Sequence, residues 1–256
     1  MLNYYFVRSE TGENINKNLD FTHAAHFVLS YDWHIGTDYH LKIEPYIQHL
    51  YHVPVIPGST YSFINLKGNE DWFVAGKVEN EGQGRNYGLD VTFEKYMSEA
   101  YYFLLTGSLF SSRYKVTANG WYNTRYNRNY VFNFLFGKEW MLGKNKQNLF
   151  GANGKLSFQG GDRYSPIDET ASVQKQDVFY NEQNPFSKQL SPALLGHFTL
   201  SYKINKYRKS HEFALKVLNI TGYKEYYGHR YNFKSGSVDE EREAIIIPNI
   251  SYKIEF

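Results

Sequence analysis

The chain has 256 residues and no cysteine, so it contains neither disulfide bonds nor thiolate metal ligands. Its formal net charge is +2 at pH 7, from 28 basic and 26 acidic residues, which argues against a nucleic-acid-binding protein with its basic excess. No apolar run reaches the ~18 residues of a transmembrane helix.

Aromatic residues are abundant, with 24 tyrosines, 19 phenylalanines and 4 tryptophans, although the chain is polar on average. A transmembrane β-barrel has both properties, because its strands alternate lipid-facing apolar residues with lumen-facing polar ones. Soluble β-sandwiches and carbohydrate-binding modules also have many aromatic residues. The composition therefore favours an all-β fold and leaves these classes open.

Apolar and polar residues alternate along most of the chain, which is typical of strands with two different faces. Every second residue is apolar from Tyr87 to Phe93, and the same pattern dominates from Tyr130 to Leu142 and from Leu194 to Ile204. Many of the runs exceed the about 9–11 residues that cross a membrane. We expect ten antiparallel strands, at residues 1–8, 22–34, 38–53, 85–97, 100–116, 126–142, 147–160, 191–205, 209–231 and 242–256.

The expected connections alternate in length. Four are short, around residues 36–37, 97–99, 143–146 and 206–208, and the others are long, at 9–21, 54–84, 117–125, 161–190 and 232–241. Short turns on one side and long loops on the other are typical of outer-membrane barrels, with the short turns on the periplasmic side. In strand 38–53, Pro45 removes one ladder donor, so we expect a bulge there.

Aromatic residues recur on the apolar face near the short turns. Interfacial tryptophan and tyrosine girdles in membrane barrels have this placement. The expected belt consists of Trp33, Tyr39, Phe93, Tyr101, Trp140, Phe150, Tyr202 and Phe213.

The last strand, PNISYKIEF, is amphipathic up to the C-terminal residue. Ile250, Tyr252, Ile254 and Phe256 share one face, and Asn249, Ser251, Lys253 and Glu255 share the other. A terminal phenylalanine on such a strand is the assembly signal of bacterial outer-membrane barrels. A soluble edge strand that ends in phenylalanine by chance is the alternative.

Several segments resemble the C-terminal barrel half of TonB-dependent outer-membrane receptors of the Bacteroidetes type. They are HFVLSYDWHI at 26–35, LKIEPYIQHLYHVPV at 41–55, NYGLDVTFEKYMSEAYYFLLTGSLFSSRYK at 86–115, NTRYNRNYVFNFLFGKEW at 123–140, GGDRYSPID at 160–168 and the last strand. The resemblance covers almost the whole chain from residue 21. It says little about the substrate.

The resemblance implies a partial wall of a twenty-two-stranded barrel whose lumen holds a plug domain. Residues 1–256 then form a single partial barrel domain, in the outer membrane, with a periplasmic C-terminus. The chain has no recognisable signal peptide, plug or TonB box, so we expect it to be the C-terminal part of a receptor, with TonB acting only through the missing N-terminal part. The other implied partners are lipid, the plug and remaining strands, the barrel-assembly machinery and an imported nutrient such as an iron chelate, oligosaccharide, cobalamin or peptide.

Candidate functional residues fall into two groups. Glu44, Asp90 and Glu94 have the parity of the lumen face, where they suit a polar wall or plug contacts better than acid–base catalysis. Exposed aromatic and arginine side chains on the long loops are candidate ligand contacts. These are Trp72, Phe73, Trp121, Tyr122, Arg163, Tyr164, Tyr227, His229 and Tyr231, with Tyr226 beside them.

We expect no enzymatic activity, cofactor or metal site. No nucleophilic triad or phosphate-binding loop stands out in the sequence. Six of the nine histidines lie between His23 and His52. Pairs such as His49 and His52, however, are three residues apart on a strand and therefore face opposite sides of the sheet. Two other functions remain open. One is an independent small outer-membrane barrel, acting as a porin or adhesin, and the other is a secreted carbohydrate-binding β-sandwich.

Overall fold

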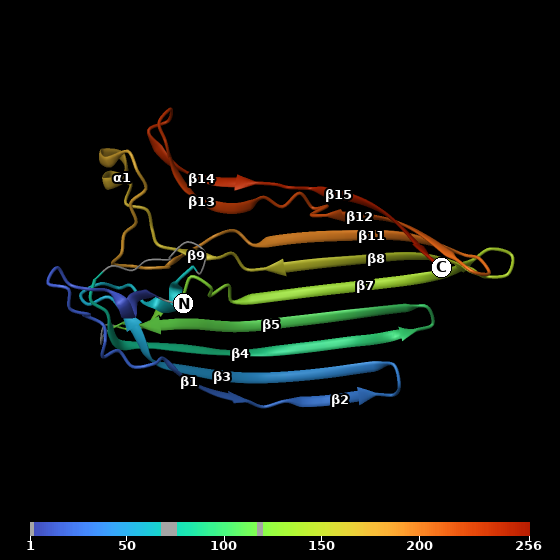
Figure 1. The fold of residues 1–256 in the computed structure, drawn as a ribbon, viewed down its shortest axis with the longest axis horizontal. Coiled ribbons are helices and arrows are strands. Elements are labelled where there is room, and N and C mark those ends of the chain that lie inside the picture. The colour runs from blue at the N-terminus through green and yellow to red at the C-terminus, as the bar shows by residue number, and fades with distance from the viewer. Residues whose placement is uncertain (1–2, 68–75, 117–119) are drawn as a thin grey trace.

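The computed structural model describes residues 3–67, 76–116 and 120–256, and these form an antiparallel all-β structure (Figure 1). This confirms the expected fold class at the level of an all-β, antiparallel chain. The main sheet has the order β1-β3-β4-β5-β7-β8-β11-β12-β15, with β2 paired to β3 and β6 paired to β5. Its strands are β1 (His23–Val28), β2 (Tyr31–Ile35), β3 (Tyr39–Val55), β4 (Glu79–Ser98), β5 (Tyr101–Lys115), β6 (Tyr122–Asn123), β7 (Tyr130–Leu142), β8 (Asn148–Gln159), β11 (Ala193–Asn205), β12 (Ser210–Leu218) and β15 (Ile247–Glu255).

Smaller elements lie at the end of the sheet where the long loops gather. Two two-stranded sheets pair β9 (Arg163–Tyr164) with β10 (Lys188–Gln189) and β13 (Glu225–Asn232) with β14 (Ser237–Glu243). The helices are η1 (Asn3–Phe6), η2 (Phe63–Asn65) and α1 (Glu169–Lys175). Among the described residues, no helix has both the length and the apolar character required to cross a membrane.

Five of the expected strands match observed strands within four residues at each end, namely those at 38–53, 100–116, 126–142, 147–160 and 191–205. The strand expected at 1–8 is wrong. That segment forms η1, and the Tyr4 ring packs against Phe63 instead of joining the sheet, with the ring centroids 4.8 Å apart. The strands expected at 209–231 and 242–256 are each divided in two. The pairing of β12 with β15 stops at the Leu218–Ile247 pair, and β13 and β14 form a separate sheet beyond it.

Pro45 disrupts the neighbouring strand rather than its own. The register of β3 with β4 runs through Pro45 without a shift, so the expected bulge is wrong. Leu29 lies opposite Pro45 and donates its N–H to the Pro45 carbonyl at 3.1 Å. Pro45 has no N–H to return, and the strand expected at 22–34 is interrupted between Val28 and Tyr31.

Beyond the Leu218–Ile247 pair, the side chain of Asn219 links the two chains. Asn219, in the left-handed conformation with φ of 53°, donates from Nδ2 to the carbonyl oxygens of Tyr223 and Ile245 at 2.8 and 3.2 Å. Its Oδ1 accepts from the Tyr223 N–H at 3.0 Å. This amide therefore joins the two chains where backbone pairing between them stops.

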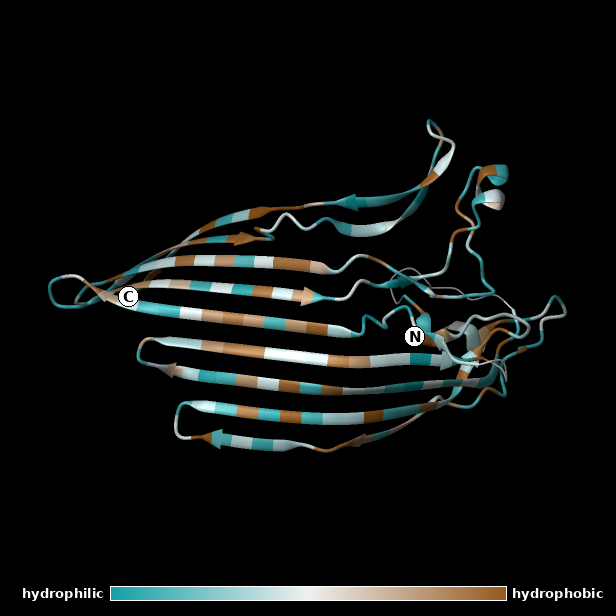
Figure 2. Ribbon diagram, turned by 180° about the vertical axis from the view of Figure 1, so that it is seen from behind, coloured by the Kyte–Doolittle hydropathy of each residue, from teal (hydrophilic) through white to brown (hydrophobic). Residues whose placement is uncertain are grey.

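The main sheet has one continuous apolar face. The register aligns Leu41 with Phe93, Phe93 with Leu105 and Leu105 with Phe134, and the series continues through β8, β11 and β12 to β15. Figure 2 shows the resulting alternation of hydrophobic and hydrophilic bands along the strands. Many of these side chains are exposed, among them Phe27, Trp33, Leu109, Phe134, Trp140, Leu156, Phe213 and Ile250.

The opposite face is mainly polar, and its side chains bond to each other across the strands. Ser157 donates to Asn133, which donates to Thr106, at 2.7 and 3.2 Å. The Ser108 hydroxyl donates to Asp90 at 2.5 Å. The two faces thus differ in chemistry along the whole width of the sheet.

Five aromatic residues form a row across the apolar face near the short turns. Trp140, Phe150, Tyr202, Phe213 and Tyr252 are successive register partners on β7, β8, β11, β12 and β15. The Trp140 and Phe150 ring centroids are 5.5 Å apart, and those of Phe213 and Tyr252 are 4.9 Å apart. Four of these residues belong to the expected belt, and the register brings them together.

The buried apolar residues of the described chain gather at the long-loop end, including the loop ends of main-sheet strands, rather than along the middle of the main sheet. One cluster contains Tyr4, Phe63 and Val78, and a second contains Val55, Tyr114 and Val116. Within the described ranges, no second sheet packs face to face on the main one, as a β-sandwich would require. The short turns at the other end lie near the C-terminus (Figure 1).

Candidate ligand-binding site

A cavity of about 510 Å³ opens among the long loops. Its volume is within the range of about 300–1,000 Å³ that is usual for small-molecule sites. Side chains from four segments far apart in sequence line it. They are Thr60, Tyr61, Lys67, Tyr114, Arg125, Tyr126, Asp162, Arg163, Tyr164, Ser165, Tyr180, Glu182, Pro185, Phe186, Leu190, Tyr226 and Tyr227, with the backbone of Gly228.

One wall of the cavity is an aromatic and cationic stack. Tyr114, at the loop end of β5, is fully buried, and its hydroxyl donates to the Thr60 carbonyl at 2.9 Å. Its ring packs edge-on against Phe186, with centroids 6.3 Å apart, and the Arg125 guanidinium lies 5.6 Å from the Phe186 centroid. Such a wall offers flat apolar surface beside a fixed positive charge.

The opposite wall is built around His229. The hydroxyls of Tyr226 and Tyr180 lie 2.6 and 3.1 Å from His229 Nδ1, and the Tyr164 ring lies 4.9 Å from the imidazole. Burial lowers the pKa of His229 and raises the pKa of both Tyr226 and Tyr180. The neutral ring can therefore accept a hydrogen bond at Nδ1, where the two hydroxyls meet, and the Tyr180 and Tyr226 hydroxyls also bond each other, which holds α1's loop and the β13–β14 hairpin together.

Two arginines join the segments below the cavity. Arg128 bonds Asp162 through two nitrogens, with Nε to Oδ1 at 2.5 Å and Nη2 to Oδ2 at 3.0 Å. Arg163 donates from Nε to the Asn127 carbonyl and from Nη2 to Asn129 Oδ1, both at 2.8 Å. These contacts fix residues 123–129 against residues 160–164.

Gly160 and Gly161 allow this close approach. A Cβ on Gly160 would overlap the Arg128 carbonyl, and a Cβ on Gly161 would overlap that of Leu190. Glycine is therefore the residue that fits at both positions.

Two arginines of the cavity, Arg125 and Arg163, have no carboxylate partner among the described residues. Asp162 is occupied by Arg128, whereas neither Arg125 nor Arg163 forms an ion pair within the described part of the chain. Nη1 of Arg125 is buried without a hydrogen-bond partner. Burial, and secondarily the charge of Arg113, lowers the pKa of Arg163. The cavity thus favours a ligand with an acceptor or an anionic group next to a flat apolar part.

The structure brings together some of the candidate loop residues. Arg163, Tyr164, Tyr226 and Tyr227 line the cavity, and His229 supports its wall. The other candidates do not line the cavity. The Arg85 guanidinium lies over Trp121, 4.7 Å from the Trp121 ring, and Tyr122 packs against Tyr114. Tyr231 is buried against Phe233, and Trp72 and Phe73 lie outside the described residues.

Sequence reasoning did not select several lining residues, notably Tyr114, Arg125, Tyr180 and Phe186. Tyr114 reads as an ordinary strand residue, and the loop tyrosines lie in segments with no periodicity. Helix α1 was not predicted either, although Asp168 is a recognisable N-cap whose carboxylate accepts a hydrogen bond from the Ala171 N–H at 2.9 Å. That cap is the one local signal in the 161–190 loop.

The remaining candidates lie on the main sheet. The register pairs Glu44 with Asp90 and His40 with Glu94, all on the polar face. Ile250, Tyr252 and Ile254 lie on the apolar face of the edge strand β15, opposite Leu215, Phe213 and His211. Phe256 follows the strand and is 95% exposed.

A comparison of the chain with protein-family models gives no match, and a comparison with curated proteins gives none either.

Proposed function

We propose that this chain is the C-terminal barrel wall of a TonB-dependent outer-membrane receptor that imports a scarce or bulky nutrient. The observation that carries the proposal is the continuous apolar face of the main sheet, which no other part of the described chain covers. A soluble protein rarely exposes an apolar surface of this extent. Lipid is the environment in which such a face is stable, and the aromatic row from Trp140 to Tyr252 suits the membrane interface.

The open shape of the sheet supports a large barrel over an independent small one. In the order of strands, β1 and β2 form one edge and β15 forms the other, and the two edges are not paired with each other. An unpaired edge is unfavourable in lipid because its N–H and C=O groups find no partner there. Further strands, as in a twenty-two-stranded barrel, would pair both edges.

The cavity supports a role in ligand capture. It lies among the long loops, at the end of the sheet opposite the short turns, which is the outer side of a bacterial barrel. In this proposal the loops bind the nutrient, and the polar face with Glu44, Asp90 and Glu94 lines the lumen and contacts the plug. Energy from TonB reaches the receptor through the plug.

Tryptophan quenching by brominated lipid tests the lipid contact. Two variants each keep a single tryptophan, either Trp140 on the apolar face or Trp121 among the loops, with the others changed to phenylalanine. We expect strong quenching of Trp140 and little quenching of Trp121 in vesicles. Equal quenching of the two would contradict the membrane assignment.

Cysteine labelling tests the topology, since the chain has no native cysteine. Ser235 lies at the tip of the β13–β14 hairpin and Arg208 lies in a short turn. We expect a membrane-impermeant maleimide to label Ser235→Cys on intact cells and Arg208→Cys only after lysis. The reverse pattern, or labelling of both on intact cells, refutes the assigned orientation.

A further inference from the structure

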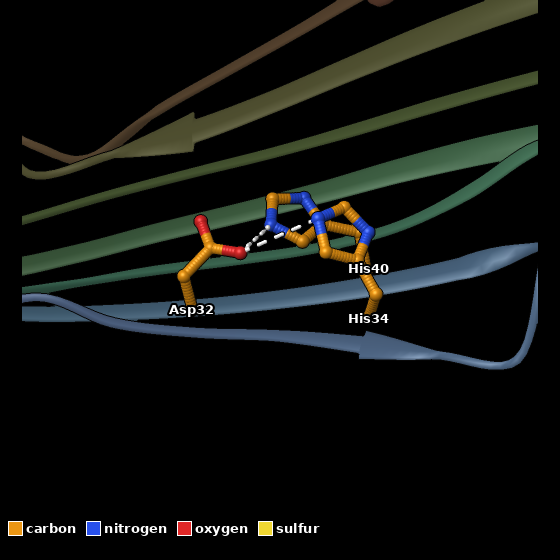
Figure 3. A group of neighbouring side chains, drawn as sticks. All are labelled: Asp32, His34 and His40. Atoms are coloured by element: carbon orange, nitrogen blue, oxygen red, sulfur yellow. Dashed lines mark hydrogen bonds and ion pairs between the residues drawn. The ribbon is translucent and has the colours of Figure 1, made fainter.

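Three side chains that can bind a metal converge on the hairpin formed by β2 and β3. His34 and His40 are direct register partners, and Asp32 precedes His34 by two residues, so all three share one face (Figure 3). The two imidazole rings stack with centroids 4.7 Å apart. This face is the polar one, near the short turn that joins the two strands.

The three donor atoms lie close enough together for one metal ion to reach them. Asp32 Oδ1 lies 3.0 Å from His40 Nε2 and 3.5 Å from His34 Nε2, and all three donor atoms lie within 4.8 Å of one another. Zinc bonds to nitrogen and oxygen of about 2.0–2.2 Å separate neighbouring ligands by about 3.3 Å. The two contacts of Asp32 bracket this value, and the exposed His34 ring completes the set when it turns out of its stack with His40.

Glu94 orients the least exposed of these side chains. Its Oε1 lies 2.8 Å from His40 Nδ1, and the two residues are register partners on β4 and β3. When Nδ1–H donates to this carboxylate, Nε2 carries the lone pair, and a metal bound there would replace the present 3.0 Å hydrogen-bond contact between Nε2 and Asp32. Carboxylate–histidine–metal arrangements of this kind fix the tautomer and make the imidazole a better ligand.

The surroundings favour a cation. Asp32 and Glu94 contribute two negative charges, and Lys42, the register partner of Asp32, is bonded to Glu44 at 2.9 Å. The side chains of Asp32 and His34 are about half exposed or more, at 47% and 65%, so a metal and a water molecule can reach the site.

We propose that Asp32, His34 and His40 form a divalent transition-metal site that takes zinc, with water as the fourth ligand and Glu94 as the positioning residue. Two histidines and one carboxylate are a usual zinc ligand set with an open position. Histidine pairs three residues apart on a single strand, such as His49 and His52, face opposite sides of the sheet. The actual site pairs histidines on two adjacent strands. The inference rests on the hairpin alone and is independent of the proposed transport function.

Calorimetric titration of the untagged, refolded chain with Zn²⁺ tests the site. We expect one zinc per chain, loss of that binding in His40→Ala and in His34→Ala, and a weakening of about 10–100-fold in Glu94→Gln. His26→Ala is the matched control, because His26 lies on the same face and sheet edge and bonds Gln48 rather than the cluster. We expect it to bind zinc as the unmodified chain does.

Cobalt gives a second readout of the same site. Co²⁺ bound to the unmodified chain should show the intense visible absorption of a four-coordinate centre, and zinc should displace it. His34 is exposed, so its replacement tests the site even if His40→Ala fails to fold. A folded unmodified chain that binds no zinc, or a loss in His26→Ala equal to that in His34→Ala, overturns the proposal.

Discussion

Leu200 and Thr199 lie side by side on β11 but face opposite sides of the sheet. Leu200 is the register partner of Ala152 and Leu215 on the apolar face, and Thr199 is the partner of Asn153 and Lys216 on the polar face. A charge at the two positions therefore separates the effect of the face from the effect of depth. We expect Leu200→Arg to destabilise the membrane-inserted protein and Thr199→Arg to be tolerated.

The size of the effect follows from the position along the strand. The apolar face of β11 runs from Leu194 to Ile204, and Leu200 is one residue from its middle. A strand that rises about 3.4 Å per residue and tilts about 40° changes depth by roughly 2.6 Å per residue, so in the proposed membrane-inserted barrel Leu200 would lie about 3 Å from the midplane of the bilayer. At this depth an arginine on the lipid face costs about 2–4 kcal/mol.

Denaturant titration of the protein in lipid vesicles measures this cost. Each variant is unfolded with guanidinium chloride and followed by tryptophan fluorescence, with heat-modifiable migration on gels as the check for folding. We expect Leu200→Arg to lose about 2–4 kcal/mol and Thr199→Arg less than about 1 kcal/mol. Equal losses at the two sites would refute the assignment of the faces.

Three further predictions concern other parts of the chain. Gly137→Ala should lower the free energy of unfolding by about 1–3 kcal/mol in the same titration, because the new Cβ meets the Tyr102 ring. Gly154→Ala has room for its Cβ and should change stability by less than about 0.5 kcal/mol. Equal effects of the two variants would contradict the packing argument. Deleting Phe256 should lower surface abundance several-fold without changing ligand binding per inserted molecule, and unchanged abundance would exclude an assembly role. Burial lowers the pKa of His229 in the folded chain. The contribution of His229 to loop stability is therefore complete above the pKa of the unfolded chain, about 6.5, and is lost as the pH falls below that value. Hydrogen exchange in the β13–β14 hairpin should rise at low pH, and His229→Gln should remove most of this pH dependence.

The strands and their faces could be predicted because alternation is a local property. The parity that places Phe134, Leu200 and Ile250 on one face is visible in short stretches of sequence, and pairing then follows from neighbouring hairpins. Pro45 shows the limit of this reasoning. The missing donor was evident from the residue, but its effect appears on the adjacent strand, which only the register reveals.

The cavity could be predicted only in part, because long-range contacts assemble it. The sequence selected Arg163 and Tyr164 by residue type, but nothing local indicates that Asp162 binds Arg128 or that the Thr60 hydroxyl donates to the Glu182 carbonyl across 122 positions. The proximity of Asp32, His34 and His40 was missed for a related reason. His34 and His40 become neighbours through hairpin register, and spacing along one strand cannot show this.

The side chain of Asn219 has a consequence for how the sequence of the β13–β14 hairpin can change in evolution. It links the two chains beyond Leu218 and Ile247, where the pairing of β12 with β15 stops, and no residue between Tyr223 and Ile245 is a register partner in that pairing. The β13–β14 hairpin can therefore lengthen, shorten or be exchanged while the wall stays the same. Because Tyr226 and Tyr227 from this hairpin line the cavity, such an exchange would alter ligand preference in one step.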